Sequence, residues 1–150
     1  MRQIVQAMLT TIPMLGVVAC DGDAAGPATL AEHYVLESAN GQDLPLGQFM
    51  LLAGGGGCAL DLTAGSIHLS VARHYVISLR YFRDCPGVDA DGTGSASSMG
   101  DYEVIGDEIS FSPDDPSIIQ LQQASVSGRT LEVQVLWSSD EQLTLGFTPE

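Results

Sequence analysis

The side chains of this sequence that could take part in chemistry are three cysteines, three histidines and an excess of carboxylates. The cysteines are Cys20, Cys58 and Cys85, and the histidines are His33, His68 and His74. With 19 carboxylates in 150 residues, spacing alone selects no acid–base pair. The sequence contains neither the Gly-x-Ser-x-Gly nucleophile turn nor a phosphate-binding Gly-x4-Gly-Lys loop, and it has no lysine. We therefore expect a protein without enzymatic activity.

Two groups of residues have spacings that metal sites use. His68 and His74 flank an expected turn and could share one face of a hairpin, where they would bind a metal weakly together with a carboxylate. Ordinary surface histidines fit the same spacing. Asp89 and Asp91 offer oxygens at alternate positions of a calcium loop, but position 12 of that loop is Gly100 instead of glutamate. We expect an acidic solvated loop there, with no metal site and no cofactor.

The amino-terminal segment predicts export and lipid attachment. Arg2 and an apolar run of about 15 residues are typical of a signal peptide, which we place at residues 1–19. The run is shorter than the roughly 20 residues of a membrane-spanning helix. The sequence Val-Val-Ala-Cys that ends at Cys20 resembles the lipoprotein box of bacterial lipoproteins, and this resemblance implies a lipidated Cys20 as the mature N-terminus. The alternative is an ordinary buried cysteine in an N-terminal helix.

The chain after the leader divides into a tether and one domain. Small and polar residues over 20–31 are typical of a flexible tether, and residues 32–150 form the expected domain. Together with the lipoprotein box, this organisation predicts a bacterial cell-envelope protein that a lipid anchor holds at a membrane, facing the periplasm or the exterior. Which membrane holds it stays open.

The charge of the chain excludes one class of partner. The formal net charge is −14, and removal of Arg2 with the leader makes it about −15. Nucleic acid and anionic lipid surfaces repel such a chain. We therefore expect no nucleic-acid partner, and we expect a monomer whose contact with the membrane is its anchor. The acidity serves solubility, or else it attracts a basic partner or cations.

Cys58 and Cys85 are the two cysteines that remain once Cys20 carries lipid. In an oxidising compartment they can form one disulfide. The bond would close a loop of about 27 residues and stabilise the fold by roughly 3.5 kcal/mol on the chain-entropy model. Two free thiols and a metal site are the alternatives, and the absence of Cys-x-x-Cys argues against the metal.

Most of the domain alternates apolar and polar residues, which predicts β-strands. The segments with this pattern are 33–38, 58–63, 66–71, 74–82, 101–106, 108–112, 118–126, 130–137 and 142–148. Most of these segments are separated by short turns, and one long connection covers 86–98. The expected turns are at 64–66, 72–73, 106–107, 127–129 and 138–140. The best helix candidate, 44–52, is weakened by Pro45 and Gly47.

Successive short hairpins predict an all-β, antiparallel up-and-down meander. A meander of this length has to close, or to split into two sheets, if it is to avoid exposed edges. We expect it to close into a small barrel of about eight strands, and a two-sheet β-sandwich is the alternative.

The domain resembles the lipocalin-like β-barrel domains of small bacterial lipoproteins. The resemblance covers about residues 32–148 and rests on the segments YVLESANGQDLP, GDYEVIGDEISF, ASVSGRTLEVQV and LTLGFT. These segments are a pattern of hairpins and contain no catalytic motif. The resemblance implies the barrel fold, but it implies little about function, because one fold hosts many functions.

Seven aromatic residues fall on the inward faces of the expected strands and are our candidate ligand-binding residues. They are Tyr34, Tyr75, Tyr81, Tyr102, Phe111, Trp137 and Phe147. An eight-stranded barrel is just wide enough to be filled by side chains or to hold one small ligand. A hollow barrel would make the protein a binding module for a small apolar molecule. A filled barrel would favour an envelope interaction or inhibitor protein that acts through its acidic surface and loops.

Overall fold

The computed structural model describes residues 30–51, 58–86, 92–115, 119–137 and 141–150, and every regular element within these ranges is a β-strand. The strands are β1 (His33–Ala39), β2 (Gln42–Asp43), β3 (Leu46–Leu51), β4 (Ala59–Leu69), β5 (His74–Asp84), β6 (Gly92–Ile105), β7 (Glu108–Pro113), β8 (Ile119–Ser127), β9 (Thr130–Trp137) and β10 (Glu141–Pro149). Along β5 and β9, buried and more exposed side chains alternate, because successive residues of a strand point to opposite faces. The all-β prediction is confirmed.

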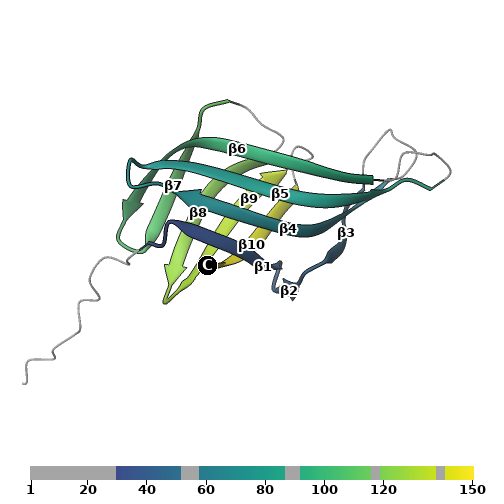
Figure 1. The fold of residues 1–150 in the computed structure, drawn as a ribbon, viewed down its shortest axis with the longest axis horizontal. Coiled ribbons are helices and arrows are strands. Elements are labelled where there is room, and N and C mark those ends of the chain that lie inside the picture. The colour runs from purple at the N-terminus through teal and green to yellow at the C-terminus, as the bar shows by residue number, and fades with distance from the viewer. Residues whose placement is uncertain (1–29, 52–57, 87–91, 116–118, 138–140) are drawn as a thin grey trace, which may run out of the picture.

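Eight of the strands form a closed antiparallel barrel (Figure 1). Strands β4 to β10 pair with their neighbours in sequence, and β1 pairs with β10 on one side and with β4 on the other. The closing seam consists of the pairs His33–His68, Tyr34–Ile67 and Val35–Ser66. Strand β2 pairs with the end of β1, and β3 pairs with the first part of β4, so both lie outside the barrel. The closed sheet confirms the predicted up-and-down barrel and rules out the two-sheet sandwich.

One end of the barrel, which we call the N-terminal rim, collects both ends of the described chain and three tight turns. The turns are residues 70–73, 106–107 and 128–129. Leu30 packs against the core beside them. Backbone hydrogen bonds join these segments: Tyr102 N donates to Arg73 O at 2.8 Å, and Glu150 N donates to His33 O at 3.2 Å. The N-terminal rim is therefore a hydrogen-bonded surface assembled from distant parts of the sequence.

The opposite rim carries a disulfide between Cys58 and Cys85. Both cysteines lie just outside the pair Ala59–Asp84, at the open end of the hairpin that β4 and β5 form. The disulfide predicted from the cysteine count is confirmed, so the free-thiol and metal alternatives are wrong. All strands of the barrel lie within residues 33–149, so residues 30–150 contain the whole barrel and its disulfide.

Strand β4 differs from the prediction. Residues 64–66, expected as a turn, lie inside it, because the strand continues through a β-bulge. A side chain at Gly65 would clash, since its Cβ would lie 2.7 Å from Leu79 Cδ2 and 3.1 Å from Leu36 Cδ2. The small residues that suggested a turn instead allow core side chains to cross close to the strand.

Strand β6 also differs, because it begins at Gly92 and occupies most of the connection predicted over 86–98. Its inward-facing residues between 94 and 100 are Gly94, Ala96, Ser98 and Gly100, which show no apolar alternation in the sequence. The region 44–52 likewise contains a strand, β3, so its helix alternative is wrong. Pairing with β4 supplies the backbone hydrogen bonds of β3.

Buried side chains from all around the barrel form a single cluster in its interior. The largest fully buried members are Tyr34, Tyr75, Phe147, Leu62, Ile67, Ile77, Leu79, Ile109, Ile119, Leu131, Leu143 and Leu145. Small residues of β6 face bulky ones of β5: the Tyr81 ring covers Gly94, whose Cβ would lie 2.6 Å from Tyr81 Cζ. Bulky side chains on one strand therefore fill the space left by small residues on the next, so the interior is packed although not every strand carries large side chains.

Candidate functional site

The seven aromatic residues proposed as ligand contacts are spread along the interior of the barrel. Six of them are at most 8% exposed, and Tyr81 is half-buried. The rings of Tyr75 and Phe111 meet edge to face at 5.0 Å, and those of Tyr81 and Trp137 do so at 5.9 Å near the opposite rim. Edge-to-face contacts of this kind are typical of a packed core. Three of the seven also line pockets: Tyr102 and Tyr34 do so at the N-terminal rim, and Tyr81 does so on the barrel wall.

Tyr75 is the most perturbed titratable group of the interior. Burial raises the pKa of its phenol above the ordinary 10.0, and the negative charge of Asp114 raises it further. A hydrogen bond with the Ser98 hydroxyl, 3.2 Å from the phenol oxygen, opposes the shift. The phenol therefore stays neutral at physiological pH and serves as a structural group.

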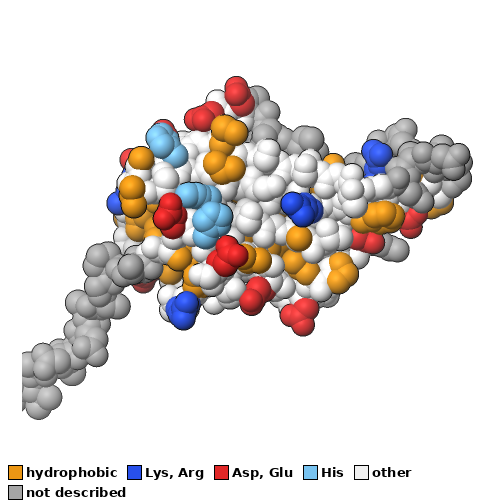
Figure 2. Space-filling view, viewed as in Figure 1, with side chains coloured by type: hydrophobic (Ala, Val, Ile, Leu, Met, Phe, Trp, Pro, Cys, Tyr) orange, Lys and Arg blue, Asp and Glu red, His pale blue; other side chains and the backbone are white. Residues whose placement is uncertain are grey.

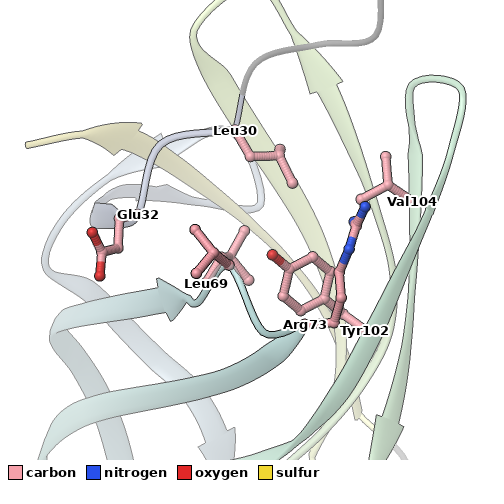
Figure 3. A pocket seen from close by; sticks show the side chains of 7 residues that line it. Leu30, Glu32, Leu69, Arg73, Tyr102 and Val104 are labelled. Carbon is pink, nitrogen blue, oxygen red and sulfur yellow. The ribbon is translucent and has the colours of Figure 1, made fainter.

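The pocket at the N-terminal rim has a volume of about 330 Å³ and is open to solvent. We call it the rim pocket. Its lining residues are Leu30, Glu32, Leu69, Val71, Arg73, Tyr102 and Val104 (Figure 3). Four of the seven are aliphatic, so most of its wall is apolar, while one guanidinium and one carboxylate provide charge. Pockets that hold small ligands combine an apolar wall with a few polar groups in this way.

The turn between β4 and β5 positions one side of the rim pocket. Arg73 N donates to Ser70 O at 3.0 Å, and His74 N donates to the Ser70 hydroxyl at 3.1 Å. The Tyr102 hydroxyl donates to the same carbonyl, Ser70 O, at 2.8 Å. These bonds hold Arg73 in the left-handed region with φ 68°, a conformation that non-glycine residues adopt at some cost. The turn is therefore defined by tertiary contacts as well as by its own residues.

The charges at the N-terminal rim are unequally paired. The Arg73 guanidinium lies over the Tyr102 ring, with Cζ 5.5 Å from the ring centroid. In the part of the chain that the structure describes, no carboxylate forms an ion pair with Arg73. Glu32, by contrast, lies 3.4 Å from His68, and Figure 3 shows Glu32 and Arg73 on different sides of Leu69. The pocket thus has a cationic side and an anionic side.

The three histidines lie on the strands next to the rim pocket, and each has a carboxylate partner. His33 pairs with Glu150 at 3.9 Å, His74 pairs with Asp101, and His68 pairs with Glu32. The rings of His33 and His68 stack at 4.8 Å across the closing seam. On the face of the molecule that Figure 2 shows, histidine and acidic side chains lie close together in one part of the surface.

The histidines show no arrangement typical of a metal centre. Within the described ranges, no group of three or more His, Cys, Asp or Glu could hold a metal ion. His68 and His74 each contact a different carboxylate, so the structure does not bring them together around one site. Asp89 and Asp91 lie outside the described residues, as does Cys20.

Sequence reasoning identified one residue of the rim pocket, Tyr102, and missed the others. The segment 66–71 was expected as one strand with Leu69 and Val71 on its inward face. In the structure Val71 lies in the turn and is 98% exposed. The one sequence feature that could have indicated the rim pocket was Arg73, because it is one of five Lys and Arg residues in an acidic chain and lies at an expected turn. Nothing in the sequence placed it against Tyr102.

Comparisons with protein-family models, with curated proteins and with solved structures found no match to this chain. Among the described residues, no helix is long and apolar enough to cross a membrane. The fold and the rim pocket are therefore the observations on which a function can be built.

Proposed function

We propose that this protein is a lipid-anchored β-barrel of the bacterial cell envelope that binds a small apolar ligand at its N-terminal rim. The observation that carries the proposal is the rim pocket, with about 330 Å³ of space against a largely aliphatic wall. That volume is near the lower end of the roughly 300–1,000 Å³ found for small-molecule sites. The interior is occupied by side chains, so the ligand belongs at the rim and not along the barrel axis.

The described chain begins at Leu30, at the same end of the barrel as the pocket, so a tether from the expected anchor would join the barrel there. Leu30, which lines the pocket, follows Cys20 by ten residues. Ten extended residues span at most about 35 Å. A lipid on Cys20 would therefore hold the N-terminal rim close to the membrane, where apolar molecules are concentrated.

The anchor is tested by growing cells with an alkyne-labelled palmitate. The wild-type protein should carry the label and fractionate with membranes, while Cys20→Ser should not be labelled. Label retained in Cys20→Ser would contradict the lipid assignment.

The ligand site is tested on residues 30–150, produced under oxidising conditions. The fluorescence of the apolar dye N-phenyl-1-naphthylamine should rise saturably on binding. Val71→Ser should weaken binding severalfold, because it removes apolar surface from the pocket wall. Val76→Ser is the matched control, since Val76 is an exposed valine that does not line the rim pocket. The site is refuted if there is no saturable binding, or if the two variants weaken it equally.

A filled interior also favours the second candidate, an envelope interaction or inhibitor protein. Val71 and Ile105 are the most exposed large apolar residues of the described chain, at 98% and 69%, and exposed apolar surface marks interaction sites. On this alternative the dye would not bind saturably, and Val71→Asp would weaken capture of a specific envelope protein in cross-linking experiments.

A further inference from the structure

We propose that the ligand of the rim pocket is a single-chain amphiphile with an anionic head, a carboxylate or a phosphate, which binds Arg73. Its apolar chain lies against Leu30, Leu69 and Val104. This inference rests on the proposed function, because it assigns a chemical class to the ligand of the same site.

The first support is the unmatched charge of Arg73. The formal net charge of the chain is −14, yet no carboxylate of the described residues forms an ion pair with this guanidinium. Each histidine near the rim, by contrast, has a carboxylate partner. A guanidinium presents a planar fork of donors that matches carboxylate and phosphate oxygens. An anionic ligand can therefore pair with Arg73 without displacing a carboxylate of the described residues.

The second support is the fixed position of that charge. The backbone of Arg73 adopts a left-handed conformation within the turn that joins β4 and β5. Tyr102 fixes the turn from two directions: its hydroxyl donates to Ser70 O, and its backbone N donates to Arg73 O. The Tyr102 ring also lies beneath the guanidinium. A cation held in place before binding loses little freedom when an anion arrives.

The third support is the arrangement of apolar and charged groups around the pocket. Leu69 separates the cationic side from Glu32 in Figure 3, and Leu30 and Val104 complete the apolar wall. Glu32 repels a second negative group, so the head is directed to Arg73 and the chain extends along the aliphatic residues. The volume of about 330 Å³ fits one short chain better than a lipid with two.

The test compares four ligands that share a twelve-carbon chain and differ in their heads. Dodecanoate, dodecyl phosphate, dodecan-1-ol and dodecyltrimethylammonium would displace N-phenyl-1-naphthylamine from residues 30–150 at pH 8, below micelle-forming concentrations. At least one anion should bind about 10-fold to 100-fold more tightly than the alcohol, as expected for hydrogen bonds to a charged group. The ratio of the two anions distinguishes a carboxylate head from a phosphate head.

Arginine variants test which guanidinium binds the anionic head of the ligand. Arg73→Gln should bring the ratio of anion to alcohol affinity close to one, and Arg73→Lys should retain part of the preference for the anion. Arg80→Gln is the matched control, because it removes the same charge from a different pocket, on the barrel wall. If Arg73→Gln does not fold, the anion-to-alcohol ratios of the wild-type and Arg73→Lys proteins decide the question.

The outcomes separate this inference from the function on which it rests. If alcohol and anions bind alike, or if Arg80→Gln removes the preference as well as Arg73→Gln does, the inference is overturned and the apolar site stands. Tighter binding of the cationic amphiphile would assign the head to Glu32 and overturn it too. If neither the dye nor any amphiphile binds, the proposed function itself fails.

Discussion

Replacing Gly100 by alanine tests the way β6 and β7 approach each other. Gly100 pairs with Pro113, and it faces Tyr75 on its other side. A Cβ at this position would lie 2.8 Å from Pro113 Cα, 3.0 Å from Asp114 N, and still closer to Ser112 O. All three are backbone atoms, so no side-chain rotation relieves the contact. The alanine variant must push the end of β7 away from β6.

The cost of this movement follows from the contacts that it disturbs. Forcing extra volume into a packed site costs about 1–3 kcal/mol. Moving β7 also weakens the hydrogen bond from Asp114 N to Met99 O, now 3.0 Å long, which adds about 1 kcal/mol. We expect Gly100→Ala to lower the free energy of unfolding by about 2–4 kcal/mol.

The assay is urea unfolding followed by the fluorescence of Trp137, the single tryptophan, which is 3% exposed in the folded barrel. Gly92→Ala is a control on the same strand, because its Cβ would meet no described atom within 4 Å. That variant should be neutral or slightly stabilising, since alanine restricts the unfolded chain. The register of β6 and β7 would be refuted if Gly100→Ala unfolded within about 0.5 kcal/mol of Gly92→Ala.

Three further predictions concern the disulfide, the buried phenol and the rim turn. Replacing Cys58 and Cys85 by alanine should lower the free energy of unfolding by up to about 3.5 kcal/mol, because the bond closes a loop of 27 residues. If reducing the wild-type protein leaves its urea midpoint unchanged, that estimate is wrong. The raised pKa of Tyr75 means that the unfolded phenol ionises first, so stability should be complete below about pH 10 and fall as pH rises, by at most about 1.4 kcal/mol per pH unit. Tyr75→Phe should make that alkaline decline shallower, and an identical decline in both proteins would contradict the assignment. Tyr102→Phe should cost about 0.5–1.5 kcal/mol in the same urea assay, since it removes the hydrogen bond to Ser70 O, and an unchanged midpoint would argue against that bond.

The sequence predicted those strands whose inward positions carry large apolar residues. In β9 these are Leu131, Val133, Val135 and Trp137, all buried in the barrel. Period-two alternation is local information, because each strand buries one face regardless of which strand lies beside it. The turns predicted at 106–107 and 127–129 also rest on local residues, because glycine readily adopts the positive φ that Gly106 and Gly128 have in the structure.

Strands with small inward residues were not predictable in this way. The inward face of β6 carries Gly94 and Gly100, so its bulk comes from neighbours such as Tyr81. Gly65 in β4 suggested a turn, yet it marks a place where Leu79 crosses the strand. In both cases the missing side chain is explained by a residue that is distant in sequence.

What the sequence determined by itself was the all-β class and the alternation that fills the interior, because strand periodicity depends only on local order. The pairing of Cys58 with Cys85 was one of three alternatives in the sequence, and the structure decided it. The closing seam between β1 and β4 and the rim pocket were decided by the tertiary structure alone. Both join residues far apart in the chain: Arg73 meets Tyr102 only because the register of β5 and β6 places Asp101 opposite His74. Register is a property of paired strands, and no single segment encodes it.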